Sequence, residues 1–483
     1  MRLSFLCSLF LSVALSTLTG CGGAGSGGSP RSGDPTPTPA PATVTVAIAP
    51  SSVSLFLLEK QQFSTTVTGT ADTRVAFEVV NGGSASTSGL YVAPNKAMTA
   101  KVRAWSVADP TKYAEAQVQV SGYAEMISDK GGTPEGYDRH TAELLPDGSV
   151  LLIGGWGTGA LHTRAERYLN GSAGVVPAGT MVTPRQGHAS VSLADDKVLV
   201  TGGYDRITSA NLFREVFKTS EIYDPAQDRF TAGPLMNRGR REHTMTLLAD
   251  GRVLVVGGIS QYGPDFSSNT ESEIYSPVTG RFDVGPSTKD GRWQHTATRL
   301  KDGRVLVVGG RPNNCAATCS LDALKTAEIF DPATNKWSST GSLRISRSGH
   351  SAGVLDDGRV VIFGGMTNED QNIRTQQVAQ VEVWDPATGK FTDFGTLHVG
   401  RTFHALVRLL DGRFLLANGY DEVEYPSATT EIFDPVTQIA TNGPNTLSNR
   451  FRGTATLLSN GQVLITSGND TTSSGVRYLE VFR

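Results

Sequence analysis

Length, composition and charge restrict the classes of protein to which this chain of 483 residues can belong. Its 54 glycines indicate a turn-rich β protein, and its formal net charge of −3 gives no electrostatic basis for a nucleic-acid partner. The length alone would suit two or three ordinary domains, but internal repeats override that expectation, so the repeats are delimited first.

The first residues have the order of a secretory signal. Arg2 precedes an apolar stretch, Leu3 to Leu15, that is too short to cross a bilayer as a mature helix. The tetrad Leu18-Thr19-Gly20-Cys21 resembles the bacterial lipobox, which implies that Cys21 is lipidated and becomes the first mature residue. The alternative is an ordinary signal peptide with a chance cysteine. We expect a lipoprotein signal peptide over residues 1–20 and a membrane anchor at Cys21. The same resemblance implies that Gly22, in place of an Asp after the Cys, favours sorting to the outer membrane or cell surface in a host that has an outer membrane.

Residues 21–121 have the composition of a spacer followed by a small β domain. Residues 21–42 are Gly/Ser-rich and then Pro-rich, which favours an extended linker without a core. Over residues 43–121, short segments alternate polar and apolar residues between turn signals, which predicts a β-sandwich. Pro50-Ser51-Ser52-Val53 and the segment from Ser88 to Pro94 resemble bacterial immunoglobulin-like domains. The resemblance implies a stalk or spacer module.

One short pattern recurs over the rest of the chain, residues 122–483. In Leu300–Gly310 an Asp-Gly pair precedes an apolar run that ends in a Gly pair. Because both central residues of a type I′ turn have positive φ, the Asp-Gly pair predicts a two-residue hairpin loop. The pattern repeats about every 50 residues, the period of a four-stranded propeller blade. The other copies are Pro146–Gly155, Ala249–Gly258, Asp356–Gly365 and Leu410–Gly419, with weaker copies at Ala194–Gly203 and Ser459–Gly468. In the last two copies along the chain, Asn418 and Ser467 stand in place of the first Gly.

Other residues also recur once per copy. A Glu follows each Gly pair, an aromatic residue stands two positions later, and in most copies an Asp-Pro turn and a further Trp or Phe come next. An Arg and, three residues later, a His open most copies. This combination resembles the Kelch repeat, which folds as a β-propeller. The predicted fold class is therefore all-β, a seven-bladed Kelch β-propeller preceded by the immunoglobulin-like sandwich; the alternative is a six-bladed ring with one hairpin packed outside.

The two ends of the repeat region complement each other. The last copy stops after its third strand, at Glu480-Val481-Phe482. Residues 127–140 align without gaps to residues 391–404, which include the fourth strand of another copy. We therefore expect the N-terminal strand to complete the last blade and to cover its open edge.

The repeated charged residues favour a structural role over a metal site. Six His and six Arg each stand at one position of a different copy, and a buried carboxylate needs a partner, so we expect contacts between the Arg and the repeated Glu. The domain combination resembles galactose oxidase and related copper radical oxidases, which bind copper through a Tyr-His pair, a second His and a Tyr cross-linked to Cys. Here no Tyr directly precedes a His. The sequence therefore predicts no copper site, no other cofactor or metal, and no nucleophile motif of the Gly-x-Ser-x-Gly type.

Cys315 and Cys319 are the cysteines that remain in the mature propeller. Outside the reducing cytoplasm such a local pair favours a disulfide. The alternative, a metal pair, would have too few ligands for a closed zinc site.

Ligand-binding residues are expected on the face that carries the connections after the Gly pairs, because these connections are long and variable while the Asp-Gly and Asp-Pro turns on the opposite face are short. Aromatic rings beside arginines suit a sugar or a peptide. The candidate ligand-binding residues are Trp156, Tyr204, Arg292, Trp293, Arg311, Arg401, Phe403 and Tyr420, with Tyr262, Phe266, Arg374 and Tyr425 on the same connections.

These features together predict a lipid-anchored cell-envelope protein that recognises a protein or a polysaccharide without catalysis. The alternative is a metal-independent carbohydrate-active enzyme, similar to a mutarotase or a lyase, on the same face. No catalytic residue is predicted.

Overall fold

The computed structural model describes residues 43–123, 126–133, 136–157, 160–170, 174–205, 215–260, 268–312, 322–368, 376–421, 426–470 and 475–483. Cys21, the spacer and the Cys315–Cys319 pair lie outside the described residues, so the anchor and the disulfide stay predictions. Every regular element in these ranges is a β-strand. Within them, no helix is long and apolar enough to span a bilayer.

The N-terminal unit is a small β-sandwich, as the alternating pattern predicts. In β8 the side chains of Ala100, Val102 and Ala104 are buried, whereas Lys101 and Arg103 between them are partly exposed. Its sheets have the orders β2-β9-β8-β5, β1-β4 and β3-β7-β6. The strands are β1 (Thr45–Ala49), β2 (Ser52–Phe56), β3 (Lys60–Gln62), β4 (Ser64–Thr68), β5 (Val75–Val80), β6 (Ser84–Ala85), β7 (Leu90–Val92), β8 (Met98–Ser106) and β9 (Tyr113–Ser121).

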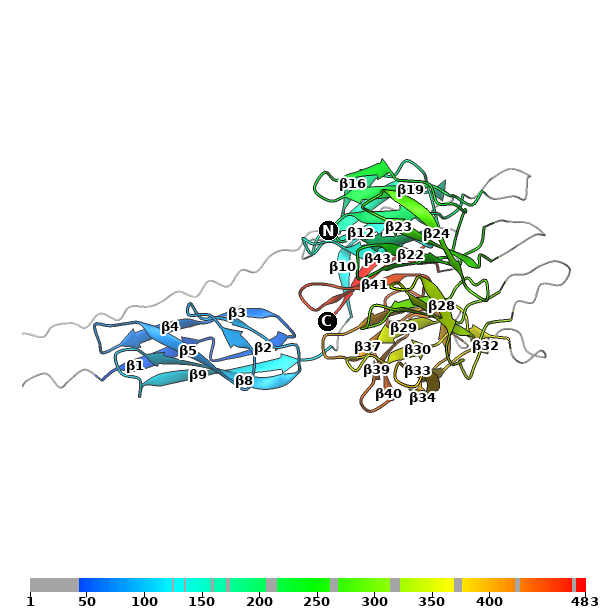
Figure 1. Cartoon of the computed structure of the whole chain (residues 1–483). Coiled ribbons are helices and arrows are strands. Elements are labelled where there is room, and N and C mark those ends of the chain that lie inside the picture. The colour runs from blue at the N-terminus through cyan, green and yellow to red at the C-terminus, as the bar shows by residue number, and fades with distance from the viewer. Residues whose placement is uncertain are drawn as a thin grey trace, which may run out of the picture.

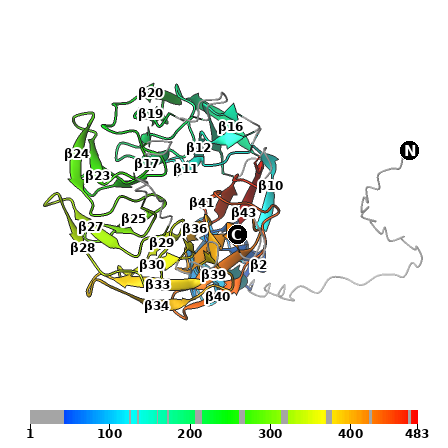
Figure 2. The same cartoon turned by 90° about the vertical axis from the view of Figure 1, so that its right-hand side faces the viewer.

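The rest of the chain forms a ring of radially arranged sheets, seen along its axis in Figure 2. In the described residues the hydrogen-bonded order gives seven units of four strands, which agrees with seven blades. Blades 5 and 6 are joined into one sheet of eight strands by a single pairing of their outer strands, Thr396 with Ile439.

The blades are numbered in chain order from their innermost strands. Blade 1 contains β11 (Thr141–Leu144), β12 (Val150–Ile153), β15 (Arg164–Tyr168) and β16 (Val175–Thr180); blade 2 contains β17 (Ala189–Ser192), β18 (Val198–Thr201), β19 (Ser220–Asp224) and β20 (Arg229–Ala232). Blade 3 contains β21 (Thr244–Leu247), β22 (Val253–Val256), β23 (Glu271–Ser276) and β24 (Arg281–Ser287); blade 4 contains β25 (Thr296–Arg299), β26 (Val305–Val308), β27 (Ala327–Asp331) and β28 (Lys336–Ser339). Blade 5 contains β29 (Ser351–Val354), β30 (Val360–Phe363), β33 (Gln380–Asp385) and β34 (Lys390–Thr396); blade 6 contains β36 (Ala405–Arg408), β37 (Phe414–Ala417), β39 (Thr430–Asp434) and β40 (Ile439–Asn442). Blade 7 contains β41 (Thr454–Leu457), β42 (Val463–Thr466), β43 (Tyr478–Phe482) and β10 (Met126–Gly132). Three short strand pairs flank the blades: β13 (Trp156–Gly157) with β14 (Ala160–Leu161), β31 (Met366–Thr367) with β32 (Gln376–Gln377), and β35 (Arg401–Thr402) with β38 (Tyr420–Asp421).

The N-terminal strand β10 completes blade 7. It pairs antiparallel with the last strand of the chain, so that Met126 faces Phe482. The expected closure is thus confirmed, and it joins the two ends of the repeat region in one sheet.

The hairpin turns differ from the predicted type. In Leu300–Arg304 the N–H of Leu300 donates to the carbonyl of Arg304 (2.8 Å) and the N–H of Gly303 to the carbonyl of Leu300 (3.0 Å). Gly303 has a φ of +89°, but Asp302 does not have positive φ. The loop therefore has three residues with a single left-handed glycine, and the prediction of a two-residue type I′ turn is wrong. Asp302 contributes through its side chain, which accepts the N–H of Arg304 at 3.1 Å.

The second strand of each blade is apolar, apart from a terminal Thr in β18 and in β42, because neighbouring blades cover both of its faces. In β26, Val305 and Val307 pack in a cluster with residues of blade 3, whereas Leu306 and Val308 pack in a cluster with residues of blade 5. All four are fully buried. The continuous apolar run is thus explained by packing on two sides.

The Gly pair forms the joint between adjacent blades. The N–H of Gly310 donates to the carbonyl of Arg347 in the next blade (2.9 Å). A Cβ on Gly309 would lie 2.6 Å from the same carbonyl oxygen and 2.9 Å from the ring of His350. Gly309 and Gly310 also have positive φ, so the motif is required by both conformation and space.

The sandwich packs directly on the hairpin turns of blades 6 and 7 (Figure 1). Tyr123 stacks on Phe482 with ring centroids 5.3 Å apart, and its hydroxyl donates to the carbonyl of Gly461 at 2.6 Å. Leu57 of the sandwich and Leu409 of blade 6 belong to one apolar cluster that runs through both units. The Gly-pair ends of the strands therefore lie on the propeller face opposite the sandwich.

Candidate ligand-binding site at the propeller axis

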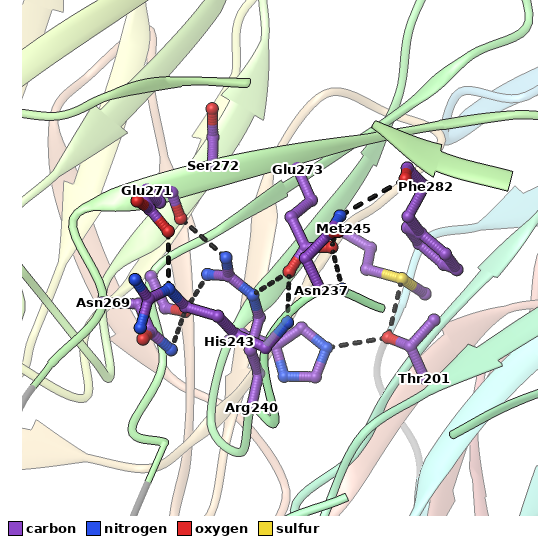
Figure 3. A network of polar contacts seen from close by, with 12 residues as sticks. Thr201, Asn237, Arg240, His243, Met245, Asn269, Glu271, Ser272, Glu273 and Phe282 are labelled. Carbon is purple, nitrogen blue, oxygen red and sulfur yellow. Dashed lines mark hydrogen bonds and ion pairs between the residues drawn. The ribbon is translucent and has the colours of Figure 1, made fainter. Parts of the chain in front are cut away.

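The repeated Arg and Glu form buried ion pairs that hold the connection between blades. Arg240 points toward Glu273 in blade 3 (Figure 3). Its Nε lies 3.1 Å from Oε1 of Glu273, and its Nη1 donates to the carbonyl of Gly257 at 2.8 Å. The second carboxylate oxygen of Glu273 accepts the backbone N–H of Asn237 at 2.7 Å. Because the buried Arg and Glu satisfy each other, the predicted structural role is confirmed.

Five more pairs repeat this arrangement. They are Arg185–Glu221 (2.8 Å), Arg292–Glu328 (2.7 Å), Arg347–Glu382 (2.6 Å), Arg401–Glu431 (2.7 Å) and Arg450–Glu480. Arg292 and Arg401, which the sequence analysis placed among the ligand-binding residues, are 0% exposed. Their selection was wrong, since both guanidinium groups are occupied inside their blades.

The six repeated His form a belt of contacts between blades. Nε2 of His243 bonds to the hydroxyl of Thr201 in the preceding blade at 2.8 Å, and Nε2 of His404 bonds to that of Ser351 at 2.6 Å. Burial lowers the pKa of His140 to about 4 and that of His243 to about 3, so both are neutral at pH 7. In the described parts of the chain, no three His, Cys, Asp or Glu side chains come together in a metal-binding group.

Three residues of each blade surround the axis at the Gly-pair face, and we call this set the axial ring. In blades 2 to 6, two of them are the residues between the repeated Arg and His, and blades 1 and 7 have Asp138-Arg139 and Phe451-Arg452 at the same positions. The third residue follows the Gly pair and pairs in antiparallel fashion with the first of them. The members are, from blade 1 to blade 7, Asp138, Arg139 and Trp156; Gln186, Gly187 and Tyr204; Arg241, Glu242 and Ile259; Trp293, Gln294 and Arg311; Ser348, Gly349 and Met366; Thr402, Phe403 and Tyr420; and Phe451, Arg452 and Asn469.

In each blade, the backbone holds the second of the three ring residues next to the propeller axis. All seven have a φ between +52° and +62°. Their amides link neighbouring blades, because the N–H of Phe403 donates to the carbonyl of Gly349 and the N–H of Arg452 to that of Phe403, both at 2.9 Å. Left-handed conformations are unfavourable for residues other than Gly, and this chain of backbone bonds holds them in place.

Side chains of blades 1 to 3 form a polar sector of the ring. Arg139 donates to the hydroxyl of Tyr204 at 2.5 Å, and its Nε lies 3.4 Å from Oε1 of Glu242, two blades away. Arg241 lies over the Tyr204 ring, 5.1 Å from its centroid. Contacts across two blade boundaries show that these side chains converge over the axis.

Side chains of blades 6 and 7 form an aromatic sector. Tyr420 stacks on Phe451 with centroids 3.9 Å apart, and Phe403 meets Tyr420 edge to face at 6.4 Å. The guanidinium of Arg452 lies over the Phe403 ring, 4.4 Å from its centroid. Rings and a forked donor are thus placed side by side, as recognition of a polar organic ligand requires.

The ring contains the other six residues predicted from the sequence. Trp156, Trp293, Phe403 and Tyr420 are partly exposed. Tyr204 is 1% exposed and Arg311 is 9% exposed, and the latter donates to the hydroxyl of Ser348 at 2.8 Å. Tyr204 and Arg311 therefore support the ring from within. The predicted neighbours Tyr262, Phe266, Arg374 and Tyr425 lie outside the described residues.

Nine ring residues that carry a charge, an amide or an aromatic ring were not predicted from the sequence, namely Asp138, Arg139, Gln186, Arg241, Glu242, Gln294, Phe451, Arg452 and Asn469. A usable signal was present in the repeats. The two positions between the repeated Arg and His differ from blade to blade, whereas the Arg and His on either side recur. Positions that vary between residues repeated in most blades are positions at which packing between blades does not determine the residue type.

A hollow of about 510 Å³ lies on the opposite, short-turn face. Turn residues of blades 1, 2 and 7 line it, among them Leu144, Asp147 and Ser459. The carboxylate of Asp147 is already bound by Ser149 and Arg167. We therefore place the candidate site at the axial ring and not in this hollow.

Comparison with known proteins supports this fold. The Kelch motif model matches residues 296–344, which contain blade 4. Galactose oxidase from Gibberella zeae is 26% identical over 295 residues, which cover 55% of this chain but only 40% of that enzyme. Among solved structures, YjhT matches with a TM-score of 0.51 and 15% identity over 66% of this chain and 100% of its own. A fungal alcohol oxidase in complex with copper matches with a TM-score of 0.56 and 16% identity over 74% and 76% of the two chains.

Copper does not fit the described His residues, because each repeated His belongs to a different blade and bonds through Nε2 to a hydroxyl group. The repeat pattern, the sheet topology and these likenesses together show a β-propeller of the Kelch type.

Proposed function

We propose that this chain is a cell-envelope binding protein, tethered through a lipid on Cys21, that recognises a protein or polysaccharide ligand at the axial ring. The observation that carries the proposal is the convergence of unlike side chains from all blades at one ring, while the residues around it repeat. Repeated residues build the scaffold, and the varied ones are free to serve recognition.

The position of the sandwich supports a role in presentation. It packs on the short-turn face through Tyr123 and Leu57, so the axial ring points away from the N-terminal side of the chain. A chain tethered at Cys21 would hold the ring toward the surroundings. The shared apolar cluster keeps the sandwich from acting as a loose linker.

The test of binding uses the full chain on arrays of immobilised glycans and of peptides. We expect hits that weaken when Phe403 is replaced by Ala. The matched control is Val436→Ala, a change in the same blade on the opposite face, where Val436 is 87% exposed. Equal loss in both variants, or none in Phe403→Ala, would contradict the placement of the site. Analysis of any bound sugar for chemical change separates binding from the alternative, a metal-independent carbohydrate-active enzyme.

The test of the anchor uses metabolic labelling with a fatty acid in a bacterial host. We expect label on the full chain and in the Cys7→Ser variant, since Cys7 lies within the signal, and no label in Cys21→Ser. Label that persists in Cys21→Ser contradicts the anchor.

A further inference from the structure

Arg452 lies at the axial ring with a charge that no described residue neutralises. No carboxylate oxygen lies within 4.0 Å of its guanidinium nitrogens, and its side chain makes no hydrogen bond in the described parts of the chain. It is only partly exposed, unlike an arginine on open surface. A partly desolvated cation without a partner is costly, which indicates that a ligand supplies one.

The surroundings of Arg452 hold it in one orientation. Its backbone N–H is bonded to the carbonyl of Phe403, and its φ is +56°. The guanidinium lies 4.4 Å from the centroid of the Phe403 ring and 5.4 Å from that of Phe451. A guanidinium stacked on aromatic faces keeps its N–H bonds in its own plane, so its edge stays available for a bidentate contact.

Other arginines near the axis do not share this state. Arg139 lies 3.8 Å from Asp138 and 3.4 Å from Glu242, and each repeated Arg is buried against a Glu. The other two ring arginines are buried, since Arg241 is 7% exposed and Arg311, which donates to the hydroxyl of Ser348 at 2.8 Å, is 9% exposed. Arg452 therefore stands out among the ring arginines as a cation left for an external carboxylate.

We propose that Arg452 binds a carboxylate group on a peptide segment of a protein ligand, with Phe403 and Phe451 as its platform. The inference rests on the function proposed above and names the ligand chemistry of that site.

Three features favour a peptide with one acidic group over an acidic polysaccharide. In the polar sector Asp138 and Glu242 offset the charges of Arg139 and Arg241, so this sector offers no excess positive charge to a polyanion, and the whole chain has a net charge of −3. Arg452 covers ring faces on which a sugar would stack. Across the ring, the buried indole N–H of Trp293 has no hydrogen-bond partner in the described residues, and peptide carbonyls supply such acceptors.

The experiment uses the full chain and capped hexapeptide libraries in which one position is fixed as Glu, Asp, Gln or Asn, together with oligogalacturonate as an acidic sugar. We expect binding of peptides with Glu or Asp, at least about tenfold weaker binding of those with Gln or Asn, and the same loss in Arg452→Gln. Arg452→Lys keeps the positive charge but loses the paired N–H donors of the guanidinium, so its affinity for the acidic peptides should lie between those of the unchanged chain and of Arg452→Gln. Arg281→Gln is the control, because Arg281 is exposed on the outer strand of blade 3.

The Glu-to-Gln comparison changes only the probe, so it remains decisive even if Arg452→Gln folds poorly. Equal binding of Glu and Gln peptides, or unchanged binding in a folded Arg452→Gln protein, overturns the proposal while leaving the ring as a binding site. Binding of oligogalacturonate alone overturns the peptide assignment. Absence of binding to every probe overturns the carboxylate proposal; the function proposed above fails as well only if the glycan and peptide arrays are also empty.

Discussion

Replacement of Arg347 by Ala removes the cation of a pair in blade 5 that is fully buried on both sides. Arg347 donates to the carbonyl of Gly364 (2.9 Å), to that of Gln380 (2.9 Å) and to Oε1 of Glu382 (2.6 Å). The change leaves two carbonyls without this donor and a carboxylate that is 0% exposed without its cation. Removing one partner of such a pair lowers the free energy of unfolding by about 3–5 kcal/mol. Native domains have only about 5–15 kcal/mol in total, so the loss is large.

Urea unfolding followed by tryptophan fluorescence measures the effect, because Trp384 is buried in the same blade. The control is Arg344→Ala, whose partner Asp393 lies 2.9 Å away with both side chains more than half exposed. A pair of this kind contributes at most about 1 kcal/mol. If Arg347→Ala lowers the unfolding free energy no more than Arg344→Ala does, the assignment of Arg347 as a structural residue is wrong.

Three further predictions, which use four substitutions, test the scaffold by the same unfolding assay. Gly251→Ala should lower the free energy of unfolding by about 1–2 kcal/mol through its positive φ alone, since nothing lies within 4 Å of the added Cβ. Gly257→Ala should lower it by about 1–3 kcal/mol more, because its Cβ would clash with the carbonyl oxygen of Arg292. Equal losses in the two variants would contradict the role of the Gly pair as the joint between blades. Burial holds the pKa of His243 at about 3, so the folded state binds fewer protons than the unfolded state, and the stabilisation is complete above pH 6.5 and is lost as the pH falls toward 3. Between pH 7 and pH 5, the free energy of unfolding should therefore fall by about 2 kcal/mol less in His243→Gln than in the unchanged chain. An identical pH dependence of the two proteins would refute this prediction. Tyr123→Phe leaves the buried carbonyl of Gly461 without its donor and should lower the free energy of unfolding by about 1–2 kcal/mol. A protease should also separate the sandwich from the propeller more rapidly in this variant. An unchanged cleavage rate would argue against tight packing of the two units.

The repeats made most of the scaffold predictable. The apolar runs, the Gly pairs and the Arg and Glu frame recur, so one interpretation could be checked in seven copies, and the match of residues 127–140 to an internal segment predicted the strand that pairs with Phe482. The turn type was mispredicted because the Asp of the Asp-Gly pair acts through its side chain, as Asp302 does. The sequence does not reveal whether an Asp adopts positive φ or accepts a neighbouring N–H.

The candidate site was only partly predictable. Trp156, Trp293, Phe403 and Tyr420 could be placed at the axial ring because each stands at a fixed position relative to the repeated residues of its blade. Arg292 and Arg401 were selected wrongly, since an arginine's residue type does not say whether a Glu on another strand has already bound it.

The sequence by itself determined the number of repeats, the strand content of each blade and the face on which function is expected. These follow from local periodicity and from turn chemistry, which act within a few residues. Only the tertiary structure decided which arginines are paired, and that Arg452 lies on aromatic rings with no carboxylate partner among the described residues. That distinction depends on contacts between blades, as between Arg452 of blade 7 and Phe403 of blade 6, and such contacts arise only when the ring has closed.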